Sequence, residues 1–193
     1  MEKFYAYLDR MKFIKRWQLM RSTREENIME HSHQVAFLTH ALCLIETEVF
    51  GGSVDTSSAI LYALYHEVSE VMTGDMPTPI KYFNGQLHGE YEKVERLAVD
   101  RIAANLPEPL KGALYPYLQA DKSTKEYAFV KAADKLSAYL KCLEELRSGN
   151  TEFTQAEKTT KAALLGKHMR AVDYFFEHFI PAFSLTLDEL ETL

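Results

Sequence analysis

Apolar residues recur every three or four positions along most of the chain, which is the spacing of one face of an α-helix. Between about residue 30 and residue 50, this stripe predicts a helix that ends by Gly51 and Gly52. Similar stripes over 55–74 and 127–147 predict two more long helices. No segment alternates apolar and polar residues for long enough to predict a β-strand, so we expect an all-α fold.

Weaker patterns predict the rest of the chain. The stripe over residues 4–20 keeps a helical beat throughout, and another helix is expected around 87–98. A last helix is expected at about 154–180, with Gly166 inside it. Residues 74–85 form the one stretch dense in proline, glycine and asparagine, which predicts a loop.

Composition supports a single helical domain. The chain has 193 residues, of which 47% are apolar and 26% are charged, close to the averages for a soluble globular domain. Only 8 glycines and 6 prolines are present, which favours long helices with short connections. No internal repeat marks a second domain, so we expect residues 1–193 to form one domain. The net charge of −6 argues against a broad surface for a nucleic-acid polymer.

The apolar runs and the cysteines bear on where the protein works. No apolar run approaches the ~18 residues that a membrane span needs, and the first residues lack a secretory apolar region. We therefore expect a cytoplasmic protein with no membrane partner. Cys43 and Cys142 show no CxxC spacing and lie in apolar helical stretches, which predicts buried thiols.

A few ionisable residues continue the apolar stripes and are therefore expected inside the molecule. His31 lies four residues before Val35, the start of the stripe in the second predicted helix. The third predicted helix brings three such groups toward the core, and the helix over 127–147 adds one carboxylate. These groups are His66, Glu67, Glu70 and Asp134.

Two histidines and up to three carboxylates from three helices would be costly to bury without a partner. A divalent cation removes this cost, and imidazole with carboxylate suits Mn, Fe, Co, Ni or Zn. The spacing alone leaves open that the helices present these faces to different neighbours, as buried ion pairs of a purely structural helical protein. The string HExxE from His66 to Glu70 has Glu70 where the zinc-protease motif HExxH has its second histidine, which argues against a metalloprotease.

Several strings resemble one family of enzymes. They are RWQLMR, EHSHQVA, YHEVSEVMTGDMPTPIKYFN, KAADKLSAYLKCLEEL and LTLDE, and they run in one frame from the amino terminus to about Glu189. Together they resemble the bacterial HD-domain 5′-deoxynucleotidases, within the HD-domain metal-dependent phosphohydrolases. The resemblance implies an HD-domain bundle of about six or more helices. It also implies a homodimer that hydrolyses deoxyribonucleoside 5′-monophosphates to deoxynucleoside and phosphate, with loose base preference.

The resemblance also assigns roles to individual residues. One divalent transition metal, such as Co or Mn, is implied to be held by His31, His66, Glu67 and Asp134. Glu70 falls where the family has the carboxylate that activates the attacking water. Arg16 matches the residue that orients the phosphate, and Trp17 matches a nucleotide contact.

Further substrate contacts are implied in the loop after Gly74 and at the metal itself. The loop residues that match the sugar-binding segment are Asp75, Met76, Pro77 and Thr78, with Asp75 placed where it disfavours a 2′-hydroxyl. Three of the metal ligands are also expected to contact the substrate, namely His31, Glu67 and Asp134.

Position 67 departs from the family pattern, which has His followed by Asp. Glu67 has one more methylene, so its carboxylate reaches the metal only if the helix or the metal shifts by about an ångström. Our hypothesis is that Glu67 still binds the metal, because the other site residues are intact. The alternative is a degenerate HD domain that binds nucleotides without efficient hydrolysis.

Overall fold

The computed structural model describes residues 1–81 and 83–192, and in that part of the chain it confirms an all-α fold. The only β-type pairing there is an isolated bridge between Lys15 and Asn27. The α-helices are α1 (Phe4–Leu8), α2 (Ile28–Leu44), α3 (Thr56–Tyr65), α4 (Glu70–Thr73), α5 (Thr78–Lys81), α6 (Gly85–Ala103), α7 (Glu108–Leu118), α8 (Lys125–Arg147), α9 (Thr154–Leu165), α10 (Arg170–His178) and α11 (Leu187–Glu191). Tighter or wider turns extend them at η1 (Asp9–Phe13), η2 (Ile45–Val49), η3 (Thr151–Phe153) and η4 (Ile180–Ser184).

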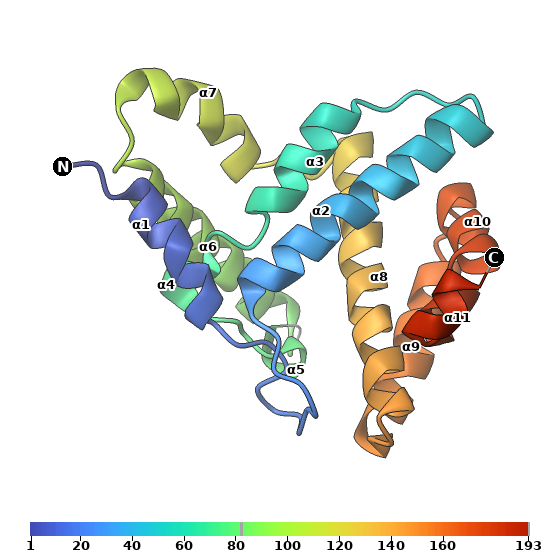
Figure 1. Cartoon of the computed structure of the whole chain (residues 1–193). Helices are drawn as coiled ribbons and strands as arrows, with labels where there is room; N and C mark the ends of the chain where they lie inside the picture. The colour runs from blue at the N-terminus through green and yellow to red at the C-terminus, as the bar shows by residue number, and fades with distance from the viewer. Residues whose placement is uncertain (82, 193) are drawn as a thin grey trace.

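Two apolar clusters hold these helices together. In Figure 1, α2, α3 and α8 cross the middle of the molecule, with α9 and α10 on one side and α1, α4, α6 and α7 on the other. The larger cluster lies between α2, α3, α8, α9 and α10 and contains Leu42 and Leu136, both fully buried. The smaller one joins α1, α6 and α7 around Phe4 and Ile102. Each such side chain contributes about 1.5–3 kcal/mol by its burial.

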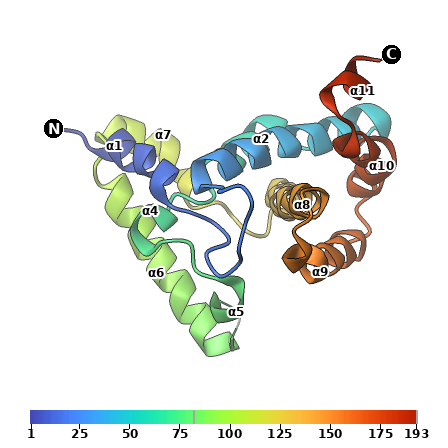
Figure 2. The same cartoon turned by 60° about the horizontal axis from the view of Figure 1, so that its bottom comes forward.

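Figure 2 shows α8 almost end-on, between α2 and α9. This central position explains why α8 carries buried residues along its whole length. Both cysteines are free thiols and are fully buried, as predicted. Among the described residues, no helix combines the length and the apolar character needed to cross a bilayer.

The predicted second helix is confirmed as α2, and its start is fixed by a cap. The side chain of Asn27 accepts hydrogen bonds from the backbone of Met29 and Glu30, both at 3.0 Å. The helix consequently begins at Ile28, two residues before the predicted start, and His31 lies in its first turn.

The prediction of an uninterrupted third helix is wrong. The chain leaves α3 after Tyr65, makes a turn through residues 66–69 and resumes as α4 at Glu70. The reason is that the residues on the two sides of the break pack into different apolar clusters. Ala63 packs in the larger cluster, whereas Val68 packs in the smaller one. His66 and Glu67 are thereby placed at the boundary between the clusters.

The helix predicted over residues 4–20 is also wrong after residue 13. Beyond η1 the chain becomes extended, and Ile28 donates a backbone hydrogen bond to Ile14 at 3.0 Å. Trp17 has a φ of 60°, which no right-handed helix accommodates. Tertiary pairing with the segment before α2 therefore overrides the local pattern.

The predicted last helix is likewise two helices, α9 and α10. Gly166 is a weak helix former at the point where α9 ends, and His168 follows with a φ of 48°. α10 is instead fixed by Arg170, which donates two hydrogen bonds to Glu46 at 2.9 and 3.0 Å. Helix α7 was not predicted, and the loop over 74–85 contains the short α5.

A candidate metal and substrate site

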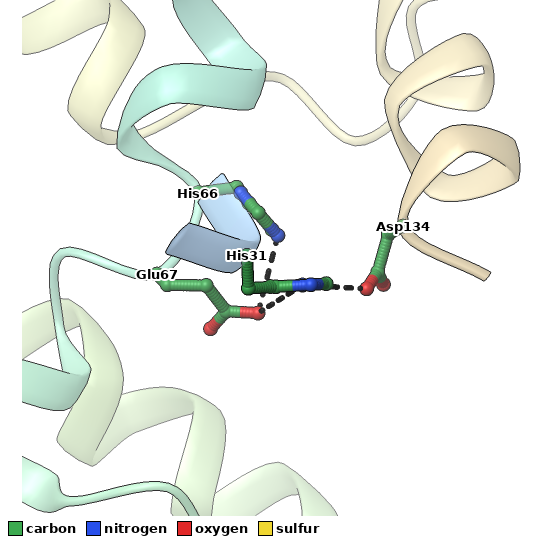
Figure 3. A group of neighbouring side chains, drawn as sticks. All are labelled: His31, His66, Glu67 and Asp134. Atoms are coloured by element: carbon green, nitrogen blue, oxygen red, sulfur yellow. Dashed lines mark ion pairs between the residues drawn. The ribbon is translucent and has the colours of Figure 1, made fainter. Parts of the chain in front are cut away.

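The predicted buried groups converge on one point. Ligand atoms of His31, His66, Glu67 and Asp134 all lie within 4.8 Å of one another, and Figure 3 shows the four side chains pointing toward a common centre. They come from the first turn of α2, the turn after α3 and the middle of α8. The expectation that the helices bring these residues together is confirmed.

Position 67 is the critical member of this group. The Glu67 Oε1 atom lies 3.2 Å from Nε2 of His66 and 3.8 Å from Nε2 of His31. On the other side, Oδ1 of Asp134 lies 3.2 Å from Nε2 of His31. The extra methylene of glutamate therefore does not remove the carboxylate from the cluster.

The hydrogen bonds made by the Nδ1 atoms of both histidines determine which ring nitrogen faces the cluster. Ser137 donates its hydroxyl hydrogen to Gln34 Oε1 at 2.6 Å, so Ser137 Oγ accepts from Nδ1 of His31 at 3.0 Å. His66 Nδ1 lies 2.6 Å from the carbonyl oxygen of Ala63, which can only accept. Both Nδ1 atoms therefore carry hydrogen, and both Nε2 atoms direct a lone pair inward.

Among the described residues, these two buried Nε2 atoms make no aligned hydrogen bond, although each has a carboxylate oxygen 3.2 Å away. Lone pairs of two imidazoles thus face carboxylate oxygens, an arrangement that requires positive charge between them. Burial and the nearby Arg16 lower the pKa of His31. Burial opposes protonation of His66 too, but the charge of Glu67 outweighs it and raises the pKa of His66. The residues present fit a divalent cation, which would supply this positive charge.

Lys131 orients the aspartate of the cluster. Its ammonium group lies 2.5 Å from Oδ2 of Asp134, which leaves Oδ1 directed at His31. Although burial opposes ionisation, the charge of Lys131 lowers the pKa of Asp134. Asp134 is therefore ionised and offers one oxygen to the cluster. Lys131 was not among the predicted site residues, although its spacing of three residues from Asp134 on a helix is a recognisable signal.

Glu70 is buried beside the cluster, at the start of α4. Burial and the charges of Glu67 and Asp75 raise the pKa of Glu70 to about 11. Without a cation nearby, this carboxyl group holds its proton at neutral pH. A bound cation adds a large positive charge and lowers the pKa of such a neighbour.

Arg16 and Trp17 lie together at the edge of the site, in the non-helical segment between η1 and α2. The Arg16 side chain is only 15% exposed, and Asp134, Glu67 and Asp75 all add to the negative potential around it. Trp17 packs against the buried Phe153, with ring centroids 5.3 Å apart. A tryptophan with positive φ costs on the order of 1 kcal/mol, and such strain gathers at functional sites.

Glu26, which was not among the predicted site residues, links these two residues. Its Oε2 atom accepts a hydrogen bond from Trp17 Nε1 at 2.8 Å and lies 3.1 Å from Nη1 of Arg16. Glu26 lies in no helix and continues no stripe. No local pattern could therefore have found it.

The predicted sugar-binding loop runs from the end of α4 into α5. Asp75, Met76 and Pro77 are half-buried, and the side chain of Thr78 lies outside the part of the chain that the structure describes. Burial and the charge of Glu67 raise the pKa of Asp75, while Arg16 acts in the opposite direction. The Asp75 carboxyl group thus interacts electrostatically with both the cluster and Arg16.

Comparison with known proteins decides the family. A family model described as YfbR-like 5′-deoxynucleotidase matches residues 3–183. The chain belongs to this 5′-deoxynucleotidase family. A relative from Pectobacterium atrosepticum, described as a 5′-deoxynucleotidase, is 50% identical over 189 residues, which are 97% of this chain and 94% of that protein. Membership of the deoxynucleotidase family confirms the resemblance drawn from the sequence strings.

Solved structures confirm the HD-domain fold of this deoxynucleotidase-family protein. An HD-domain phosphohydrolase from Listeria innocua superposes with a TM-score of 0.82 at 23% identity, covering 94% of this chain and 88% of that one. The HD phosphohydrolase DatZ of cyanophage S-2L, described as bound to dA and one catalytic Zn²⁺ ion, gives a TM-score of 0.62 at 22% identity. That match covers 92% of this chain and 95% of DatZ.

Proposed function

We propose that the protein hydrolyses deoxyribonucleoside 5′-monophosphates to deoxynucleoside and phosphate, with one divalent transition metal at His31, His66, Glu67 and Asp134. The observation that carries this proposal is a pair of buried Nε2 atoms that face two carboxylates and make no aligned hydrogen bond within the described part of the chain. Membership of the 5′-deoxynucleotidase family supplies the reaction. DatZ, which shares the fold, is described with a catalytic zinc ion, and Co, Mn or a similar ion suits the same donors.

The residues around the cluster divide the chemistry between them. When bound, the cation polarises a phosphoryl oxygen and lowers the pKa of water. Glu70 accepts the proton of the attacking water, since it is buried at the start of α4, directly after the turn that carries His66, and lies beside Glu67. Arg16 holds the phosphate, because among the described residues no aligned hydrogen bond occupies its Nη1 atom.

The nucleoside contacts the half-buried residues around the cluster. Trp17 offers an indole face, and the loop residues Asp75, Met76, Pro77 and Thr78 read the sugar. A carboxylate at Asp75 discriminates against ribonucleotides if it occupies the space of a 2′-hydroxyl. Three cluster members, His31, Glu67 and Asp134, also face the substrate phosphate.

Phosphate release from a panel of deoxy- and ribonucleoside 5′-monophosphates, with Mn, Co, Zn or Mg, tests the proposal. Wild-type protein should release phosphate from the deoxynucleotides, and Glu70→Ala should lower kcat by about 100-fold or more. Metal analysis of the purified protein should find about one ion per chain. Equal rates on ribo- and deoxynucleotides would contradict the role of Asp75.

The alternative of a degenerate, non-hydrolysing domain has a direct test at position 67. If Glu67 serves as a ligand, both wild type and Glu67→Asp should bind metal and release phosphate. If wild type releases none and Glu67→Asp does, the degenerate alternative is correct.

We also propose a cytoplasmic homodimer that acts on small molecules and on neither nucleic-acid polymers nor membranes. Two free cysteines are typical of a reducing compartment, and cell fractionation tests the location. For the dimer, α6 presents exposed apolar side chains such as Val94 and Leu97, the latter 66% exposed. Sedimentation velocity should give a mass near twice that of one chain.

A further inference from the structure

Backbone pairing brings Glu26 next to the two predicted substrate contacts. Arg16 donates a backbone hydrogen bond to the Glu26 carbonyl at 2.9 Å, beside the bridge between Lys15 and Asn27. The segment 14–17 is thereby held against 26–28. The backbone of Glu26 is thus held in place by these hydrogen bonds, independently of the contacts of its side chain.

The loop between these paired segments is itself anchored in the core. Fully buried Glu145 accepts hydrogen bonds from the backbone and the hydroxyl of Thr23, both at 2.8 Å. Asn150 donates to the carbonyl of Arg21 at 2.7 Å. The segment that carries Arg16 and Trp17 is consequently held at two places, by the backbone pairing of 14–17 with 26–28 and by the contacts of the loop between them.

One carboxylate oxygen of Glu26 then serves two different side chains. Oε2 accepts from Trp17 Nε1 at 2.8 Å and lies 3.1 Å from Arg16 Nη1, while the side chain of Glu26 is only 13% exposed. Arg16 and Trp17 stack as well, with the guanidinium carbon 5.6 Å from the indole centroid. The two substrate contacts thus share a single anchor.

The ion pair with Glu26 does not use up the hydrogen-bonding capacity of Arg16. Nη1 lies 3.1 Å from the carboxylate, but among the described residues its N–H groups are not aligned with any acceptor, although the atom is buried. The charge of Glu26 therefore holds Arg16 in place without occupying these donors. A phosphate that meets these N–H groups need not displace Glu26.

We propose that Glu26 is a positioning residue that holds Arg16, for the phosphate, and Trp17, for the nucleoside, in one fixed arrangement. The inference rests on the proposed function, because it assigns Glu26 through the roles of these two residues. Neighbouring Glu25 provides the matched control. Its side chain is 75% exposed and pairs with the exposed Lys15, at 2.6 Å.

The test compares E26Q, E26A and E26D with E25Q, by steady-state kinetics and by tryptophan fluorescence. Trp17 is the only tryptophan of the chain, so its emission reports this position directly. E26Q keeps the shape but removes the charge, and we expect kcat/KM to fall by about tenfold or more, as for loss of a charge-assisted contact. E25Q should stay within about twofold of wild type, and E26D should recover part of what E26A loses.

A double-mutant comparison separates positioning from general stability. If Glu26 acts through Arg16, adding E26Q to R16M should change kcat/KM by less than about twofold beyond R16M alone. E26A should shift the emission maximum of Trp17, and E25Q should not. Circular dichroism and metal content check that each variant is folded. If E26Q does not fold, the comparison of E26D with E26A tests the positioning role by the same kinetic and fluorescence measurements.

The proposal is overturned if E26Q behaves like E25Q, or if its loss simply adds to that of R16M. Failure of the proposed function looks different. Wild-type protein would then release no phosphate from any deoxynucleotide with any of the metals. The positioning role would still be measured by quenching of Trp17 on titration with a deoxynucleoside monophosphate, which should weaken in E26Q and not in E25Q.

Discussion

Replacing Glu145 with glutamine removes the buried charge that anchors the loop after Trp17. Five groups donate to this carboxylate: the Lys141 ammonium at 2.5 Å, the backbone and hydroxyl of Thr23, the Asn150 amide at 2.8 Å and the Arg24 backbone at 3.3 Å. Burial opposes its ionisation, but these donors outweigh burial and lower the pKa of Glu145 to about 2. A glutamine accepts at one oxygen only, and it leaves Lys141 buried beside its amide hydrogens.

The pKa shift sets the magnitude. A change from the ordinary 4.5 to about 2 corresponds to about 3 kcal/mol of stability at neutral pH. Because the folded-state pKa is the lower one, this stability is present above the unfolded pKa and is lost as the pH falls from about 4.5 toward 2. About 1.4 kcal/mol should be gone by pH 3.5.

Urea unfolding followed by circular dichroism, at pH 7 and at pH 3.5, measures both effects. At pH 7, Glu145→Gln should lose about 3 kcal/mol, or about 6–12 °C in Tm. At pH 3.5 the gap between variant and wild type should narrow by about 1.4 kcal/mol. The control is Glu144→Gln. Glu144 is exposed and forms a surface ion pair with the exposed Arg24, at 3.5 Å, so its charge contributes little to stability. A gap that is the same at both pH values would refute the reasoning.

Three further predictions concern the metal and the domain. Lys131→Met should weaken metal binding by about 10–100-fold in a metal titration, because Asp134 loses the partner that orients it, whereas Lys135→Met on the same helix should not. Chelation with EDTA should lower the Tm by several degrees, because the facing lone pairs and carboxylates lose their cation, and added Mn or Co should restore it; an unchanged Tm would count against the site. The expected single domain over residues 1–193 should unfold in one cooperative transition, with fluorescence and circular dichroism coincident.

The cluster could be predicted because each of its residues continues a helical stripe. A stripe is a local property, and a polar residue on it must either be buried or end the helix. His31, which is buried, and Asp134, which is half-buried, follow this rule within uninterrupted helices. His66 and Glu67 are half-buried and lie in a turn, where the stripe over 55–74 predicts a continuous helix.

The substrate side of the site could not be predicted from periodicity. Arg16, Trp17 and Glu26 lie outside the helices, where position depends on pairing between segments ten residues apart. The resemblance to deoxynucleotidases indicated the first two, and only the structure brought in Glu26. The breaks after Tyr65 and Gly166 were missed for a similar reason, because packing against two separate cores, or one arginine pair, outweighs a continuous local pattern.

The start of α2 places three tasks within six residues. Glu26 anchors the residues proposed to hold the substrate, Asn27 caps the helix, and His31 contributes a nitrogen to the cluster. One short stretch of backbone therefore carries all three, so a substitution that moves it is expected to disturb the helix cap, the cluster and the proposed substrate contacts together. If an ion at the cluster tightens nucleotide binding through this stretch, the nucleotide must tighten ion binding by the same factor.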